Sequence, residues 1–203
     1  PRSTDTVTIR ARLEDTSERG LSATLFYRVS SLEAPEFSTV VMSDDGLHDD
    51  GDAGDGLFAA NLPAMEDGTV VEFYVSATDG GNVRTWPAPT TIGQVANLHY
   101  QVDDEPNPEG EGIYRVVMTR TESRAFSRID RDSNAQHHCT LIADDCSGPV
   151  VRYQCGVRVR GASSRQDNPP PMRLNLPRDR PWNGASQMNL NTQFTWLQFI
   201  GMK

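Results

Sequence analysis

The sequence of 203 residues has almost no lysine: of its 19 basic residues all but Lys203 are arginine, so a mechanism that needs an internal lysine ammonium is excluded. Aromatic residues make up only 7%, and cysteine occurs 3 times. No apolar run approaches the ~18 residues of a membrane-spanning helix, so we expect no membrane span. The chain begins at Pro1 without a charged and apolar leader, which indicates a fragment or processed form of a longer protein.

Acidic residues outnumber basic ones 28 to 19, which argues against a general binder of nucleic acid or anionic membranes. Residues 1–104 hold 6 arginines and 18 acidic residues, whereas residues 105–203 hold 13 basic and 10 acidic ones. Prolines, glycines and acidic side chains at residues 104–112 predict a stiff, extended linker. We therefore expect one domain at residues 1–103 and a second at residues 113–203.

Residues 5–104 show the two-residue alternation of half-buried strands, with Val7, Ile9 and Leu13 on one face of the first. Turn clusters separate the apolar segments, and no amphipathic helix of three turns is present. This pattern predicts an all-β immunoglobulin-like or fibronectin-like sandwich. Strands are expected over residues 6–13, 23–29, 37–42, 70–77 and 98–102.

The second half is predicted to have the order strand, helix, three strands and helix, which is typical of the α+β class. We expect a short helix capped by Thr121 and running through Arg128. A second helix is expected to start after Asn191, and the chain ends within it, which supports a truncated domain. Strands are expected over residues 113–118, 139–143, 150–160 and 172–176.

Residues 44–56 form an acidic loop with six aspartates and four glycines. Oxygen ligands on a flexible turn suit Ca²⁺, although no helices flank the loop as they would in an EF-hand. In the alternative interpretation the glycines supply positive φ and the aspartates cap backbone amides. We expect His48 to be a surface residue rather than a ligand. The candidate metal ligands are Asp44, Asp45, Asp49, Asp50, Asp52 and Asp55.

Cys139, Cys146 and Cys155 have no CxxC spacing, so a four-cysteine zinc site is excluded, and a three-cysteine site completed by a histidine at 137–138 is remote. If the hairpin turn centres on Ser147, Cys139 faces Cys155 within disulfide range. Two interpretations stay open: a disulfide in an oxidising compartment, or two small buried apolar residues. Cys146 could be free in the turn.

The segment Gly156–Arg165 predicts a strand that ends in a small-residue turn with two hydroxyls. Backbone amides, hydroxyls and a guanidinium together suit a phosphate group. The turn is not a Walker loop, since it has neither GK[ST] nor a lysine. In the alternative interpretation its arginines pair with acidic surface residues.

Three motifs carry a resemblance to a known family: VRVRGASSR at 157–165, RLNL at 173–176 and MNLN at 188–191. Through them residues 113–203 resemble the amino-terminal part of the spore coat protein H (CotH) kinase-like family. The resemblance implies a truncated, kinase-like amino-terminal subdomain. It also implies an atypical protein kinase that uses ATP with Mg²⁺ or Mn²⁺ on secreted or surface proteins. It assigns the phosphates to Arg160, Ser163, Ser164, Arg165 and Arg173.

The sequence also departs from the family pattern. Ala162 replaces an asparagine, Asn175 replaces a lysine, and Pro169–Pro171 stands where lysines are usual. A kinase needs a cation near the phosphates, and arginine does not simply replace lysine there. The metal-binding carboxylates of the family would lie beyond Lys203, so these residues alone are not expected to be catalytic.

The first half resembles the immunoglobulin-like module that often precedes such domains in secreted bacterial proteins, through residues 42–46, 53–58 and 68–75. The resemblances together imply a secreted or cell-surface multidomain protein that acts on a protein substrate or ligand. One interpretation is phosphoryl transfer from ATP to protein hydroxyls. The other is a non-catalytic adhesion or structural protein with a degenerate kinase-like domain.

Overall fold

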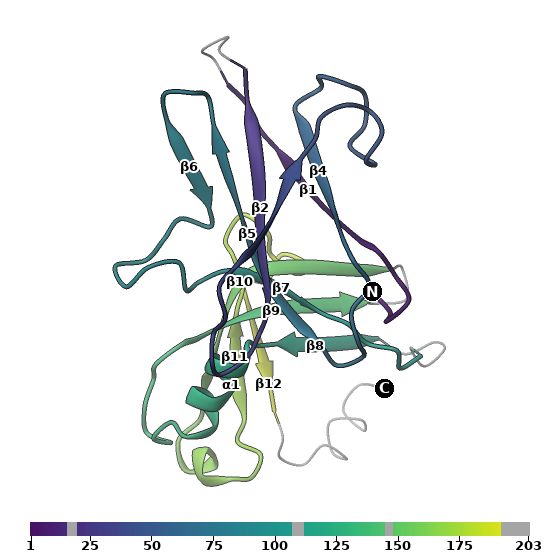
Figure 1. Ribbon diagram of the computed structural model, residues 1–203. Coiled ribbons are helices and arrows are strands. Elements are labelled where there is room, and N and C mark those ends of the chain that lie inside the picture. The colour runs from purple at the N-terminus through teal and green to yellow at the C-terminus, as the bar shows by residue number, and fades with distance from the viewer. Residues whose placement is uncertain (16–19, 107–111, 145–147, 192–203) are drawn as a thin grey trace. The chain divides into compact units, whose positions relative to one another are not determined.

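The computed structural model describes residues 1–15, 20–106, 112–144 and 148–191 (Figure 1). The chain divides into two compact units, Pro1–Pro108 and Glu109–Lys203, here called unit 1 and unit 2. Among the described residues, none of the helices has the length and apolar character needed to span a bilayer.

In its described residues, unit 1 forms two antiparallel sheets. The smaller sheet pairs β1 (Val7–Arg12) with β4 (Leu57–Leu62). The larger sheet has the order β3-β2-β5-β6, and β7 also pairs with β5. Its strands are β2 (Ser22–Val29), β3 (Ser38–Met42), β5 (Val70–Thr78), β6 (Val83–Trp86) and β7 (Leu98–Gln101).

Both sheets of unit 1 contribute side chains to its core. Ile9 and Leu62 come from the smaller sheet, Leu25 and Phe73 come from the larger one, and all four are buried. Each large apolar side chain contributes roughly 1.5–3 kcal/mol when fully buried. Two sheets that bury their apolar side chains in one core form a β-sandwich, as the alternation predicts.

The five strands expected in the first half are present, each within one residue of its expected ends. β4 and β6 were not predicted. β4 is buried at four of six positions and therefore lacks a clear alternation. β6 has only four residues and no buried side chain, so it carries little apolar signal.

Unit 2 contains a five-stranded antiparallel sheet in which each strand lies beside the next one in the chain. The helix α1 (Arg120–Ser127) joins β8 to β9, and the 3₁₀ helix η1 (Ser163–Gln166) lies between β10 and β11. The strands are β8 (Ile113–Val117), β9 (His137–Asp144), β10 (Pro149–Val159), β11 (Met172–Asn175) and β12 (Gln187–Leu190).

One face of this sheet carries the core of unit 2. Leu141, Val157 and Leu174 are at most 1% exposed, and Phe126 of α1 packs against the same cluster. The described part of unit 2 is thus a sheet with one short α-helix, and this architecture does not by itself show a kinase-like subdomain.

The expected cap of α1 at Thr121 is wrong. The helix begins at Arg120, and the side chain of Thr119 accepts a hydrogen bond from the Glu122 amide at 3.2 Å. Thr119 has the extended backbone that an N-cap needs, whereas Thr121 already lies in the first turn. β12 was predicted only as a segment before a helix. The helix expected after Asn191 lies outside the described residues.

Candidate functional site

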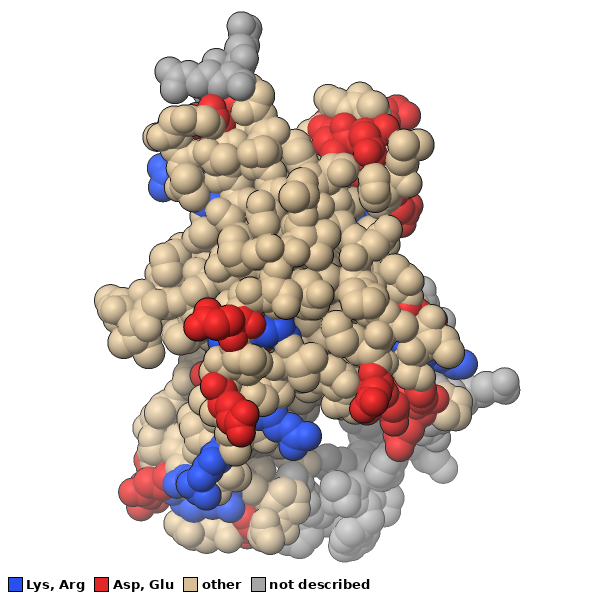
Figure 2. All heavy atoms as spheres, in the orientation of Figure 1, with Lys and Arg blue, Asp and Glu red and all other residues tan. Residues whose placement is uncertain are grey.

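The acidic loop, residues 44–56, connects β3 to β4, and Figure 2 shows acidic side chains gathered at this end of unit 1. Arginines of β1 hold the loop from one side. Arg10 donates to both the carboxylate and the carbonyl oxygen of Asp49, and Arg12 Nη1 donates to the Asp55 carbonyl at 3.2 Å. The loop therefore has cationic partners within its own unit.

Asp50 is the centre of the acidic loop and is 0% exposed. Its Oδ2 accepts from the amides of Asp45 at 2.6 Å and Gly46 at 3.2 Å, and its Oδ1 accepts from the His48 amide at 3.3 Å. Burial acts to raise the pKa of Asp50, but these amides together outweigh it and hold the pKa below its usual value. The carboxylate is therefore ionised and committed to the backbone.

Other aspartates of the loop also accept from amides. Asp44 accepts from Gly54 at 2.8 Å and from Gly56 at 2.9 Å, one with each carboxylate oxygen. Gly56 has φ of +84°, and a Cβ there would lie 2.8 Å from the Leu13 carbonyl oxygen. Glycines at positive φ and aspartates on amides form the capped turn that was the alternative to a calcium loop.

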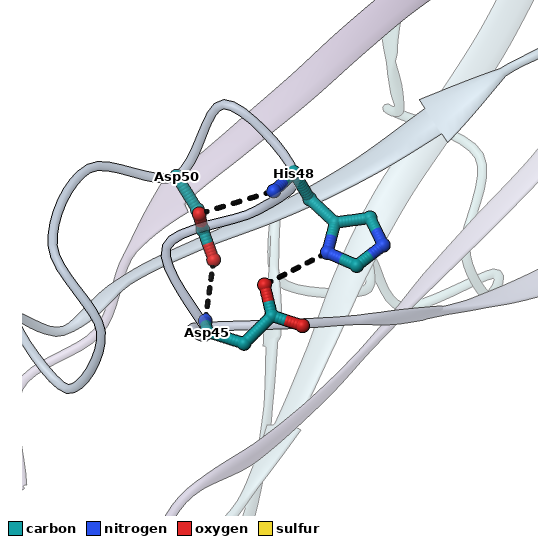
Figure 3. Close-up of side chains that lie close together, drawn as sticks. All are labelled: Asp45, His48 and Asp50. Atoms are coloured by element: carbon teal, nitrogen blue, oxygen red, sulfur yellow. Dashed lines mark hydrogen bonds and ion pairs between the residues drawn. The ribbon is translucent and has the colours of Figure 1, made fainter.

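Asp45, His48 and Asp50 bring potential ligand atoms within 4.8 Å of one another (Figure 3). His48 Nδ1 lies 2.8 Å from Asp45 Oδ1, and this hydrogen bond raises the pKa of His48. Protonation competes with metal binding at the imidazole. The predicted ligands Asp44, Asp49, Asp52 and Asp55 do not join this cluster. Calcium binding by the loop stays a prediction.

The second candidate site is the arginine end of unit 2, defined as Arg158, Arg160 and Arg173. Arg158 on β10 lies directly opposite Arg173 on β11. Arg173 in turn lies opposite Asn189 on β12. In the described part of the chain none of these three arginines forms a salt bridge, so neighbouring carboxylates do not neutralise their charge.

The hydrogen bonds of the arginine end go to neutral acceptors. Arg158 Nη1 donates to the Asn134 side chain at 3.2 Å and to the Val159 carbonyl at 3.1 Å, and Arg160 donates to the Asn191 side chain. Arg173 Nε is buried, and no hydrogen-bond acceptor is described for it. The arginine end therefore combines unneutralised charge with one unused buried donor.

Arg165 has a different environment from the other predicted phosphate ligands. Its Nε donates to the Gly161 carbonyl at 2.8 Å, and its Nη1 donates to the Arg131 and Ser133 carbonyls at 3.1 and 3.0 Å. Its Nη2 donates to Asn134 Oδ1 at 2.6 Å. Four of its five N–H groups are occupied, so Arg165 fastens the 131–134 loop to the turn after β10.

Ser163 and Ser164 are the first two residues of η1, and Ala162 separates them from Gly161. Gly161 has φ of +103°, and a Cβ there would lie 2.1 Å from Ser164 Oγ, so only glycine lets this hydroxyl approach the backbone so closely. Arg158 was missing from the predicted phosphate ligands, although the alternation in VRVR places it on the same face as Arg160.

In a comparison with known protein families, a model of an Ig-like domain matches part of the chain. The description is "Conditioned medium factor 2nd Ig-like domain", and the match covers residues 4–82, which is less than half of the chain. It agrees with the sandwich of unit 1, which is an Ig-like module. The CotH family did not match. Neither a curated protein nor a solved structure matches the chain.

Proposed function

We propose that unit 2 binds a phosphate-bearing ligand at its arginine end, as part of a secreted or cell-surface protein whose Ig-like module is unit 1. The observation that carries the proposal is the direct opposition of Arg158 and Arg173 without a carboxylate partner in the described residues. Like charges directly opposite in a sheet are destabilising, so a bound anion would relieve a repulsion that the fold itself creates.

Guanidinium groups suit this ligand class because their planar N–H donors match phosphate oxygens in pairs. The Nε of Arg173 is a buried donor that a ligand oxygen could use. An unsatisfied buried donor costs ~1–3 kcal/mol, so satisfying it favours binding. The net charge of −9 works against non-specific anion binding, so any affinity would come from this local arrangement.

ATP is the ligand that the CotH resemblance supports. Arg160 and Arg173 would hold the phosphates, with the hydroxyls of Ser163 and Ser164 near the same turn. Arg165 would position that turn rather than touch the nucleotide, because its donors are occupied. Bound ATP with Mg²⁺ or Mn²⁺ would supply a transferable phosphoryl group, and a secreted or surface protein hydroxyl would be the acceptor.

A non-catalytic adhesion or structural role is the second candidate. Two observations favour it: Pro169–Pro171 replaces lysines of the family pattern, and Arg165 is engaged in holding the fold. Under this alternative the arginine end would bind a phosphorylated or other anionic ligand without transferring a group.

The test is a thermal-shift titration of the full chain with ATP and with inorganic triphosphate, each with and without Mg²⁺ or Mn²⁺. A ligand at 100 times its dissociation constant stabilises the folded state by ~2.7 kcal/mol. Arg173→Gln and Arg158→Gln should abolish the rise in midpoint. Arg178→Gln removes the same charge from an exposed site beyond the other end of β11 and serves as the matched control.

A rise that needs the metal and ATP together favours the kinase-like role. A metal-independent rise with both anions favours simple anion binding. No rise in the folded wild-type chain, or equal responses in Arg173→Gln and Arg178→Gln, would overturn the proposal.

A further inference from the structure

Cys139 on β9 and Cys155 on β10 are register partners in adjacent antiparallel strands. Directly opposed residues in such strands have Cα atoms ~4.5–5.5 Å apart, which lies inside the ~4.4–6.8 Å that a disulfide bond requires. Both thiols are free in the structure, and the two residues are only 0% and 2% exposed. The fold therefore places two unbridged thiols where one bond could join them.

A β-bulge creates this pairing. Arg152 pairs with Leu141, but the register then shifts, so that two residues of β10 lie opposite Thr140 before Cys155 meets Cys139. One of them, Gln154, has φ of +58°. Without the extra residue Gln154 would oppose Cys139, and Cys155 would point to the other face of the sheet.

We propose that Cys139 and Cys155 form a disulfide bond when the chain folds in an oxidising compartment. The bond would link β9 to β10 at the bulge. β10 is the strand that leads into the turn before η1. This inference does not depend on phosphate binding, because neither cysteine belongs to the arginine end.

The oxidant would be a small-molecule or protein disulfide. One cysteine thiolate attacks it, forms a mixed disulfide and displaces one oxidant thiolate. The second cysteine thiolate attacks the cysteine sulfur of that mixed disulfide and displaces the other oxidant thiolate. Two cysteine thiols become one disulfide, the oxidant is reduced to two thiols, and the two cysteine protons pass to the displaced thiolates.

The burial of both thiols determines when the bond can form. Burial raises the pKa of Cys155 to about 11 and also raises the pKa of Cys139 above its ordinary value. The thiolate is the reactive form, so a folded and reduced chain should oxidise slowly. The bond should therefore form during folding, before the core closes around Leu141 and Val157, and should afterwards resist reductants.

The test starts from the full chain, reduced and denatured, which is refolded in mixed reduced and oxidised glutathione and then alkylated. Trypsin cuts after Arg131, Arg152 and Arg158, which leaves Cys139 and Cys146 in one peptide. A second cleavage between Asp144 and Asp145 separates them. Mass spectrometry without reduction should then show the Cys139 and Cys155 peptides linked, and Cys146 alkylated.

Cys146→Ser is the matched control and should keep the link, while Cys155→Ser should lose it. Reduction in denaturant followed by refolding should lower the thermal midpoint of wild type and of Cys146→Ser by several degrees. If Cys155→Ser does not fold, the peptide maps of wild type and Cys146→Ser still decide. Alkylated Cys139 and Cys155 in a refolded chain, or a bond that involves Cys146, would overturn the proposal.

Discussion

Glu72 on β5 lies directly opposite Arg28 on β2, and its Oε1 accepts a hydrogen bond from Arg28 Nε at 2.9 Å. The side chains are 6% and 15% exposed, so this is a largely buried ion pair. Asn97 donates to the second carboxylate oxygen at 3.1 Å, and the guanidinium lies 4.2 Å from the ring centroid of Phe37. Each charged group thus has an oppositely charged partner and a further favourable contact, and a buried ion pair needs both to offset the cost of removing its charges from water.

Glu72→Gln should lower the free energy of unfolding by ~3 kcal/mol, because it leaves the charge of Arg28 buried without a partner. The double replacement Arg28→Met/Glu72→Leu removes both charges and should be more stable than Glu72→Gln. Denaturant unfolding of the full chain measures both. A double variant less stable than the single one would contradict the pair as the source of the effect.

Asp50→Asn should lower the thermal midpoint by several degrees at neutral pH, because an amide group cannot accept from three backbone amides as a carboxylate does. The lowered pKa of Asp50 adds stability above the ordinary carboxyl pKa of 3.8, and this stability is lost as pH falls through the folded-state value. The stability of Asp50→Asn should therefore depend less on pH below 4 than the stability of wild type does. Asp52→Asn, at an exposed site in the same loop, is the control, and EDTA excludes metal effects. Equal shifts in both variants would contradict the role of Asp50.

Alkaline pH should destabilise the reduced chain more than the oxidised one. Because burial raises the pKa of Cys155 from 9.0 to about 11, the folded reduced state binds more protons than the unfolded state in that range. Stability should therefore fall as pH rises above about 9. The disulfide form lacks these thiols and should lose less. Thermal midpoints of both forms between pH 8 and 11 measure the difference, and parallel curves would contradict it.

Thr119→Ala should lower the free energy of unfolding of unit 2 by ~1 kcal/mol, because it removes the side chain that caps α1. Thr121→Ala is the matched control, since Thr121 is exposed within the first turn and should change stability little. Denaturant unfolding of the two variants distinguishes the positions. A larger loss in Thr121→Ala would mean that the helix begins later.

Arg165→Lys should destabilise unit 2 by ~2 kcal/mol, because lysine keeps the charge but cannot replace the guanidinium fork that donates to three carbonyls and Asn134. Hydrogen exchange should show faster exchange in the 131–134 loop. Arg178→Lys, at an exposed site, is the control. Unchanged stability together with lost ATP binding would instead place Arg165 in direct contact with phosphate.

Much of the fold could be predicted because alternation is a local property. The alternation of apolar residues such as Val7 and Ile9 in the strands of unit 1 indicates which side chains face a core, independently of which strand each one pairs with. The same reasoning did not predict β4, which is buried on both faces, or β6, which is an exposed strand of four residues. The acidic loop shows why a functional site is harder to predict from sequence than a strand. Its composition suits both calcium binding and the capping of backbone amides, and only the folded structure shows that its aspartates accept hydrogen bonds from amides.

By itself, the sequence determined the strand pattern, the glycines that permit the acidic loop, and the concentration of arginine in the second half. The tertiary structure decided which groups meet. The pairing of Cys139 with Cys155 was predicted from a turn centred on Ser147. The residues nearer the turn are paired one position away from that predicted register, and the extra residue of the bulge brings Cys155 back opposite Cys139. Likewise, only the folded chain brings the carbonyls of Arg131 and Ser133 to Arg165. Alternation follows from neighbouring residues, whereas bulges and side-chain partners depend on segments far apart in the chain.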